Sequence, residues 1–277
     1  MRLPLPRTRV MNLLIAAAVI LAALALFVRW LEPRMAFFPF PGEAETPREF
    51  GIAYEPLTID TTDGEHLRAW LLRAPQPRAR IVYFHGNGGN LSNWAPILAG
   101  IARRGYSVLA IDYRGYGVST GRPSERGLYK DVEALVTRPW PSAENPRPLV
   151  YWGRSLGGAM AAYAATVRKP DGVIVEAGFP DARSVVRSSP VLAVLSLFAS
   201  YRFPAAEFLD AAAVPVLQLH GDRDSVIPIA LGRELSERIR GPKTFVVIPG
   251  GDHNDAVAPD QAAYWSAIDR FIAGLPR

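Results

Sequence analysis

The amino-acid sequence predicts an α/β protein with a mostly parallel central sheet, helices on both faces of that sheet, and a transmembrane helix at the N-terminus. Two observations predict the sheet. Short, continuously apolar runs of strand length recur along the chain, and helical stretches separate them. Strands that are buried on both faces have this continuous apolar character, and parallel strands need helical crossovers. The 277 residues suffice for one such domain with a small appendage.

The expected elements alternate from residue 56 onward. Two short strands flank Asp63-Gly64, a pair that favours a hairpin turn. The strands are expected at 56–60, 67–72, 81–84, 108–111, 149–152, 173–175, 216–219 and 244–248, and the helices at 95–103, 128–136, 156–167, 230–240 and 261–273. The gap 179–213 is too long for a simple crossover and contains an apolar stretch, 191–203, so we expect a small cap insertion there.

The N-terminal segment carries sixteen uninterrupted apolar residues, 13–28, with Arg9 and Arg29 on either side. This stretch is just long enough to cross a bilayer as a helix. Ala23-Leu24-Ala25 resembles the cleavage site of a signal peptide, which is the competing interpretation. Because the apolar run continues past that site, we expect a retained anchor at 1–34, a proline-rich linker at 35–50 and the folded domain at 51–277.

The net charge of +5 belongs mainly to the anchor. Residues 1–34 carry five arginines against one acidic residue, whereas the other 243 residues hold 26 basic and 25 acidic side chains. The nearly neutral domain therefore lacks the basic surface of a nucleic-acid-binding protein. A small basic excess before the apolar run favours a cytoplasmic N-terminus and an extracytoplasmic domain. The chain has no cysteine, which excludes disulfides and thiol catalysis.

The strongest motif is Gly153-Arg154-Ser155-Leu156-Gly157, a G-x-S-x-G sequence between an expected strand and an expected helix. A sharp strand-to-helix turn exposes the serine hydroxyl, and the flanking glycines allow close packing of the backbone. The helix N-terminus also directs free N–H groups at the reacting centre. Ser155 is therefore the candidate nucleophile.

A serine nucleophile needs a base, and the chain has four histidines. Triads of this strand–turn–helix type run in the order serine, acid, histidine. His66 and His85 precede Ser155, and His220 precedes the aspartates that follow it. His253, in the loop after the last expected strand, satisfies the order and is the candidate base.

The acid is expected in His220-Gly221-Asp222-Arg223-Asp224, directly after the strand 216–219. A carboxylate here would orient the imidazole and stabilise the imidazolium formed during attack. Spacing alone leaves the choice between Asp222 and Asp224 open. The other aspartate is expected to form a turn or to accept a backbone hydrogen bond.

A glycine-rich loop, His85-Gly86-Asn87-Gly88-Gly89, follows the strand 81–84. Its glycines let the backbone approach an acyl oxygen, so the N–H groups of Asn87 and Leu156 are the candidate oxyanion donors. The alternative is a phosphate-binding loop. The spacing of its glycines and the lack of a lysine argue against that alternative.

Five motifs together resemble the ABHD-type α/β-hydrolases, in particular the branch with an N-terminal membrane helix. They are His85-Gly-Asn-Gly-Gly-Asn90, Asp112-Tyr-Arg-Gly-Tyr-Gly117, the run 121–129, Gly153-Arg-Ser-Leu-Gly-Gly158 and His220-Gly-Asp-Arg-Asp224. The resemblance spans about residues 50–273 and implies the α/β-hydrolase fold with Ser155, Asp224 and His253 as triad, because the acid of that family is the second aspartate of its motif. It also implies esterase, lipase or thioesterase activity. Asp112, Arg114 and Tyr116 are expected to serve as scaffold.

These patterns predict acyl transfer to water through an acyl-enzyme, with a small or lipid-like acyl ester as substrate. No metal or organic cofactor is expected, since neither H-E-x-x-H nor a cluster of carboxylates is present. An aminopeptidase-like serine hydrolase is the alternative within enzymes. A catalytically silent, membrane-anchored binding protein is the alternative from another class.

Overall fold

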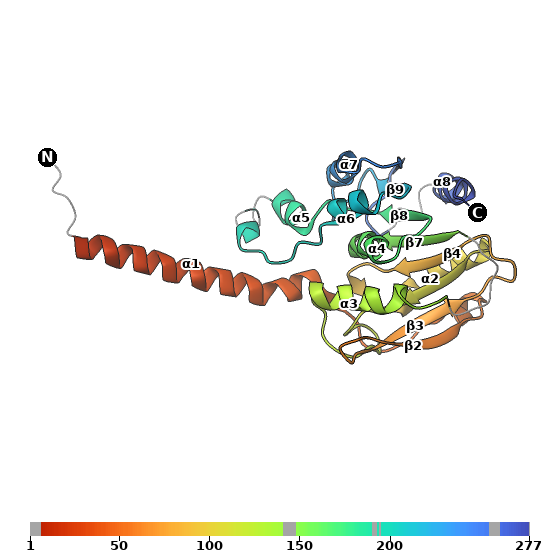
Figure 1. Cartoon of the computed structure of the whole chain (residues 1–277), viewed down its shortest axis with the longest axis horizontal. Coiled ribbons are helices and arrows are strands. Elements are labelled where there is room, and N and C mark those ends of the chain that lie inside the picture. The colour runs from red at the N-terminus through yellow and green to blue at the C-terminus, as the bar shows by residue number, and fades with distance from the viewer. Residues whose placement is uncertain (1–6, 141–147, 190–192, 194, 255–260, 277) are drawn as a thin grey trace.

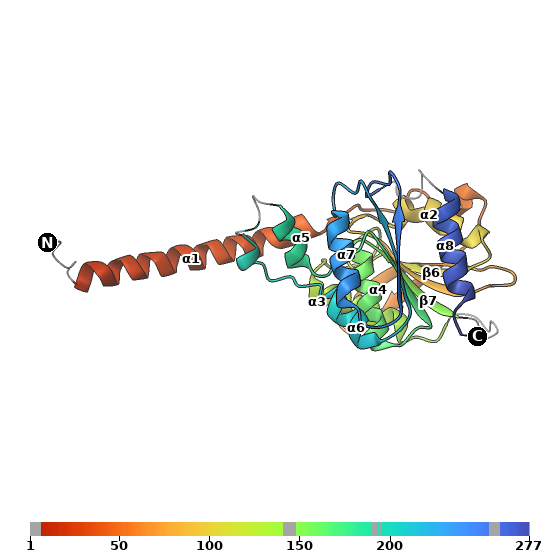
Figure 2. The same cartoon turned by 90° about the horizontal axis from the view of Figure 1, so that it is seen from above.

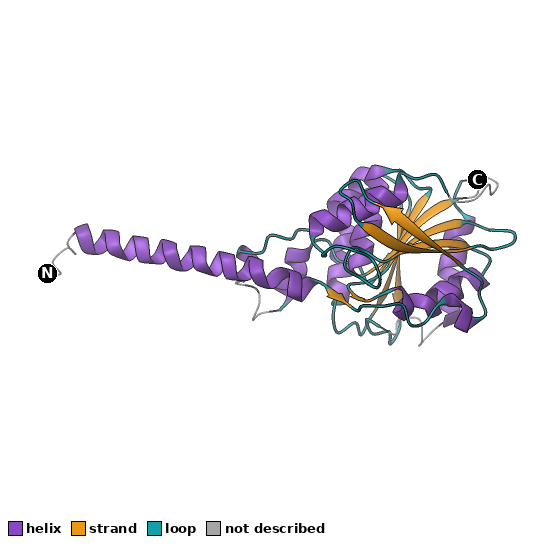
Figure 3. Cartoon of the chain, turned by 90° about the horizontal axis from the view of Figure 1, so that it is seen from below, coloured by secondary structure: helices purple, strands orange, loops and turns teal. Residues whose placement is uncertain are grey.

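The computed structural model describes residues 7–140, 148–189, 193, 195–254 and 261–276. A long helix, α1 (Arg7–Ala36), projects from a domain in which a twisted sheet lies between helices (Figures 1 and 3). The mostly parallel sheet covered on both faces, and the apolar helix that precedes it, confirm the fold class predicted from the sequence.

The main sheet has eight strands in the order β10-β9-β8-β7-β4-β6-β3-β2. β3 runs antiparallel to β2 and to β6, and the other neighbouring pairs are parallel. The strands are β2 (Glu55–Asp60), β3 (His66–Leu72), β4 (Arg80–Phe84), β6 (Ser107–Ile111), β7 (Leu149–Arg154), β8 (Gly172–Glu176), β9 (Val216–Gly221) and β10 (Lys243–Ile248). Because the carboxyl ends of parallel strands meet at one edge, the loops after β4, β7, β9 and β10 gather there.

Two layers of helices cover the sheet (Figure 2). One layer consists of α3 (Glu125–Val136), α4 (Leu156–Val167), α6 (Ala205–Ala212) and α7 (Ile229–Arg238), and the other of α2 (Leu91–Arg103) and α8 (Gln261–Ala273). Each layer seals a separate apolar core against one face of the sheet. The alanine- and glycine-rich α4 is buried along most of its length, because it lies between the sheet, α3 and α6.

Two helices begin three or four residues earlier than the sequence pattern predicts. The helix expected at 128–136 starts at Glu125, after the N-cap Ser124. The helix expected at 95–103 starts at Leu91, because the side chain of Asn90 accepts a hydrogen bond from the N–H of Ser92 at 2.9 Å and caps the first turn. Pro96 lies inside this helix, which favoured the later start.

The segment expected as a cap, 179–213, forms short helices. They are α5 (Ala182–Ser188), the 3-10 turn η2 (Leu195–Leu197) and α6. Val191, Leu192 and Val194, which belong to its apolar stretch, lie outside the described residues. In both views α5 lies beside the C-terminal half of α1 (Figures 1 and 2).

The segment expected as a linker is packed on the domain. α1 continues through Pro33 to Ala36, and the next residue, Phe37, is buried. β1 (Phe38–Pro39) then pairs in parallel with β5 (Gly88–Gly89). The 3-10 helix η1 (Pro47–Phe50) lies against α2. The chain therefore enters the domain within one residue of the end of α1.

The part of α1 nearest the N-terminus has no neighbour in the domain. Residues 8–23 are exposed, whereas Val28 is buried and Leu31 is half-buried. Within the described residues, Thr8–Ala36 is the one helix long and apolar enough to cross a membrane.

Candidate active site

Ser155 occupies the sharp turn between β7 and α4. Its backbone has φ of 53° and ψ of −118°, a strained conformation for a residue other than glycine. The turn is possible because glycines flank it: a Cβ atom on Gly157 would lie 2.0 Å from the carbonyl oxygen of Phe84. The N–H of Ser155 donates to the carbonyl of Glu176 at 2.8 Å, which fixes the turn at the carboxyl edge of the sheet.

His253 and Asp224 form a buried pair on the loops after β10 and β9. Nδ1 of His253 lies 2.8 Å from Oδ2 of Asp224. The other oxygen, Oδ1, accepts hydrogen bonds from the N–H groups of Val226 at 3.0 Å and Ile227 at 2.7 Å. Burial alone would raise the pKa of Asp224, but the hydrogen bonds from His253 and Ile227 outweigh it and lower the pKa. Asp224 is therefore an ionised acceptor for the imidazole.

Asp222 and His220 lie close to this pair, but their hydrogen-bond partners differ from those of Asp224. Asp222 is exposed and accepts a hydrogen bond from the N–H of Gly250 at 2.6 Å, so it fixes the turn between the two loops. His220 is buried, with Nε2 2.8 Å from the carbonyl oxygen of Ile227 and 3.5 Å from Asp224. Burial lowers the pKa of His220. The geometry thus brings His253 to Asp224 and not to Asp222.

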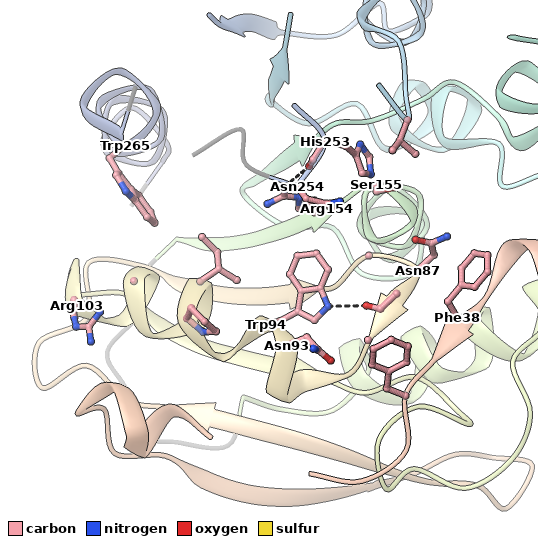
Figure 4. A pocket seen from close by; sticks show the side chains of 18 residues that line it. Phe38, Asn87, Asn93, Trp94, Arg103, Arg154, Ser155, His253, Asn254 and Trp265 are labelled. Atoms are coloured by element: carbon pink, nitrogen blue, oxygen red, sulfur yellow. Dashed lines mark hydrogen bonds between the residues drawn. The ribbon is translucent and has the colours of Figure 1, made fainter. Parts of the chain in front are cut away.

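Two cavities meet at Ser155. The larger one has a volume of about 930 Å³ and includes His253, Arg154 and Trp94 in its lining (Figure 4). The smaller one, about 380 Å³, is almost entirely apolar and includes Leu156. Ser155 and Asn87 line both cavities, so they lie where the two join.

Of the two predicted oxyanion donors, Asn87 lines both cavities and Leu156 lines the smaller one. Leu156 is the first residue of α4, where a backbone N–H has no acceptor within the helix. Asn87 lies in the loop between β4 and β5, and its carbonyl accepts hydrogen bonds from the N–H of Phe38 at 2.9 Å and the hydroxyl of Tyr116 at 2.8 Å. These bonds hold the Asn87 loop from two sides.

The Asp112–Gly117 motif lies behind the Asn87 loop and lines neither cavity. Asp112 accepts from the N–H of Leu91 at 2.8 Å, and the hydroxyl of Tyr113 donates to the carbonyl of His85 at 3.0 Å. Arg114 forms ion pairs with Asp131 at 2.8 Å and Asp63 at 2.9 Å. These contacts agree with the scaffold role expected from the sequence.

Sequence reasoning missed a buried ion pair beside Ser155. Arg154 donates a hydrogen bond to the backbone carbonyl of His253, and its Nη1 lies 3.8 Å from Oε2 of Glu176. Glu176 also accepts hydrogen bonds from Trp152 at 2.7 Å and from the hydroxyl of Tyr264. Burial raises the pKa of Glu176, and the charge of Arg154 opposes that rise. The available signal was a lone acidic residue directly after the apolar strand 173–175.

Across the described ranges, no three His, Asp or Glu side chains are grouped so that they could hold a metal ion. Of the residues that line both cavities, Ser155 and Asn87 are the polar ones.

Known proteins resemble this chain over most of its length. The membrane protein YNL320W of Saccharomyces cerevisiae is 34% identical over 236 residues, which are 82% of each chain. Protein bem46 of Schizosaccharomyces pombe is 32% identical over 286 residues, 92% of this chain and 90% of the relative. A Mycobacterium tuberculosis protein, Rv2307c, is 30% identical over 274 residues, 97% and 96% of the two chains.

Solved structures that resemble the domain include esterases. The Pyrococcus furiosus esterase Pf2001 superposes with a TM-score of 0.70 at 17% identity, over 87% of this chain and 98% of that one. Acetyl xylan esterase 1 of Thermoanaerobacterium has a TM-score of 0.60 at 17% identity, over 79% and 83%. These likenesses show the fold.

The model of one family, described as serine aminopeptidase, S33, matches residues 75–210. The fold and the relatives that share 30% identity or more over most of both chains point the same way. The chain belongs to the ABHD-type branch of the α/β-hydrolase superfamily.

Proposed function

We propose that the protein is a membrane-anchored serine hydrolase that cleaves carboxylic esters or thioesters through an acyl-enzyme. One observation carries the proposal: the His253–Asp224 pair, joined at 2.8 Å, reaches the same cavity as Ser155. A buried carboxylate behind an imidazole, next to a serine on a strained turn, is the arrangement that activates a hydroxyl.

The residues act in sequence. Oγ of Ser155 attacks the carbonyl carbon while its proton passes to Nε2 of His253, and the N–H groups of Asn87 and Leu156 bind the oxyanion. When the tetrahedral intermediate collapses, the bond to the leaving group breaks and His253 protonates that group. Water then gives a proton to His253 and attacks the acyl carbon. When this second intermediate collapses, the bond from the acyl carbon to Oγ breaks, His253 returns its proton to Oγ, and the acid is released. Asp224 keeps the proton on Nδ1 and stabilises the imidazolium.

The two cavities match the two halves of an ester. His253 lines the larger cavity, so the group that it protonates leaves on that side. Leu156 lines the smaller, apolar cavity, which suits the acyl chain. A substrate that lies across Ser155 thus places its alcohol or thiol in the larger cavity.

An aminopeptidase is the second candidate, because the matching family model carries that description. Such an enzyme needs an anionic group to bind the α-ammonium of its substrate. Among the described residues that line the two cavities, the one carboxylate is that of Glu32. It already accepts hydrogen bonds from the N–H groups of Ser200 and Tyr201. This arrangement favours ester substrates.

The proposal includes a single-pass anchor with the domain outside the cytoplasm. The exposed apolar surface of residues 8–23, the arginines that flank the span, and the description of YNL320W as a membrane protein support it. The chain should stay in the membrane fraction after carbonate extraction. A mature N-terminus at Leu26 would instead show cleavage of a signal peptide.

Labelling with a fluorophosphonate tests the chemistry. The full chain in detergent should be labelled and should hydrolyse p-nitrophenyl esters, and Ser155→Ala should lose both properties. Ser236→Ala, on α7 and away from both cavities, is the matched control and should keep both. Full labelling of Ser155→Ala would refute the nucleophile. An unlabelled, inactive wild type would favour the silent binding protein.

A further inference from the structure

The anchor helix forms one wall of the smaller cavity. Val28, Leu31, Glu32 and Met35 of α1 line it, at the three- and four-residue spacing of one helix face. The cap supplies the facing wall, and Ser155 lies at the inner end. A helix that only anchored the domain would not need to line the cavity that contains Ser155.

The position of this wall relative to a bilayer follows from the length of the helix. From Arg9 to Arg29 the helix rises about 30 Å, at about 1.5 Å per residue, which matches the hydrocarbon thickness of a membrane. Trp30 follows, with the guanidinium of Arg34 4.0 Å from its ring centroid, a pairing typical of the membrane–water interface. Val28 is therefore at the bilayer surface, and so is the outer end of the smaller cavity.

Several residues that line this cavity are apolar and exposed. Met35, Phe38 and Val226 are each between 48% and 54% exposed. Met35 belongs to the α1 wall, whereas Phe38 and Val226 also line the larger cavity. Exposed apolar side chains are unfavourable against water, whereas the same side chains against lipid are not.

Glu32 fastens the cap to this wall. Its carboxylate accepts hydrogen bonds from the N–H of Ser200 at 2.6 Å, from the N–H of Tyr201 at 2.9 Å and from the hydroxyl of Ser200. The ring of Tyr201 packs on Phe37 with 5.6 Å between centroids. Glu32 is the one acidic residue among the first 34. Its carboxylate nevertheless accepts three hydrogen bonds, all from residues of the cap. The wall is thus held in place by specific contacts.

Given the proposed function, we infer that the smaller cavity receives the acyl chain of an ester dissolved in the same bilayer as α1. The chain enters between α1 and the cap, and Val28 and Met35 select its length. The apolar lining, the nucleophile at one end and the bilayer surface at the other carry this assignment. Each methylene that the cavity buries should improve binding by up to roughly fourfold.

Reconstituted vesicles test the route of entry. The full chain is placed in phosphatidylcholine vesicles, and 4-methylumbelliferyl oleate is dissolved either in those vesicles or in separate, enzyme-free vesicles. Hydrolysis should be at least tenfold faster when enzyme and ester share a bilayer. Equal rates in the two arrangements would overturn the lateral route, because the ester would then reach Ser155 through water.

Substitutions on α1 test the wall. In detergent, the ratio of kcat/KM for p-nitrophenyl decanoate to that for the acetate should fall at least tenfold in Met35→Trp, because the larger ring fills the cavity. Leu26→Trp is the control, since Leu26 is exposed on α1 and lines neither cavity. Val28→Ala enlarges the cavity and should move the preferred chain length upward.

The two proposals fail in different ways. A Met35→Trp variant that fluorophosphonate still labels at Ser155, and that keeps the wild-type chain-length profile, would refute the role of α1 while leaving the hydrolase intact. If Met35→Trp does not fold, a Val28→Ala variant with the wild-type chain-length profile would also refute the role of α1 while leaving the hydrolase intact. A wild type that fluorophosphonate does not label would refute the proposed function itself.

Discussion

Arg154, which directly precedes the proposed nucleophile, donates a hydrogen bond to the backbone carbonyl of His253, 99 residues further along the chain. The same guanidinium faces Glu176 and lies 5.7 Å from the ring centroid of Trp94. One buried side chain therefore joins the Ser155 turn to the loop that carries His253. We expect Arg154 to act as a positioning residue for His253.

Replacing Arg154 separates this positioning from stability. Arg154→Met should lower the unfolding free energy by about 3–5 kcal/mol, because it leaves the buried Glu176 without its partner, and it should also lower kcat. Adding Glu176→Gln should restore most of the stability but not kcat, since the bond to His253 stays missing. Urea unfolding and ester hydrolysis of the two single variants and the double variant measure this. Purely additive losses in stability would contradict the pairing.

The two aspartates after β9 should differ sharply. Asp224→Asn should lower kcat by roughly three to four orders of magnitude, the scale expected when the carboxylate of a triad is neutralised. Asp222→Asn is its matched control two residues away and should have a small effect, because Asp222 accepts a hydrogen bond from Gly250 and not from His253. Steady-state kinetics with p-nitrophenyl butyrate decide between them. The reverse order of severity would assign the acid to Asp222.

The hydroxyl of Tyr116 should matter for catalysis although it lies outside both cavities. Tyr116→Phe removes the 2.8 Å bond to the carbonyl of Asn87 and loosens one oxyanion donor. We expect kcat to fall about tenfold with KM nearly unchanged, less than the hundredfold or more for loss of a whole donor. Tyr151→Phe is the control, because the buried hydroxyl of Tyr151 has no hydrogen-bond partner among the described residues. Equal effects of both changes would remove the special role of Tyr116.

The buried His220 should make stability depend on pH. Burial lowers its pKa, Asp224 opposes that shift, and His253 and Arg233 add to it. Because the unfolded chain binds this proton more readily, the contribution of His220 is complete above about pH 6.5 and is lost as pH falls toward the lowered folded pKa. The unfolding free energy should therefore decline between pH 7 and pH 5, less steeply in His220→Gln. A slope that His220→Gln leaves unchanged would place the titration elsewhere.

The sequence predicted the parts of the molecule that depend on local patterns. Apolar runs located the eight strands to within a few residues, and α4 and α8 have the expected bounds. The order of Ser155 and His253 along the chain singled out the histidine that the structure places at the same cavity. The six strands between the edges of the sheet, β3, β4, β6, β7, β8 and β9, are mostly buried, so each produces an apolar run that can be recognised locally.

The remaining features depend on contacts between distant segments, which carry no local signal. Spacing could not separate Asp222 from Asp224, because the path of the loop after β10 decides which carboxylate meets His253. β1 and β5 have two residues each, too few for a periodic pattern. Glu32 has no local signal either, because its partner Ser200 lies 168 residues further along the chain.

The short passage from α1 into β1 restricts where the chain can change in length. Phe37 alone separates the helix from Phe38, whose N–H donates to the carbonyl of Asn87. Successive residues of a strand face opposite sides, so an inserted or deleted residue here would exchange the buried Phe37 for a neighbour and displace the partner of Asn87. At the Arg7 end, an added turn would only lengthen the helix. If α1 spans a membrane as proposed, its length can therefore change at the Arg7 end but not at the end that enters the domain.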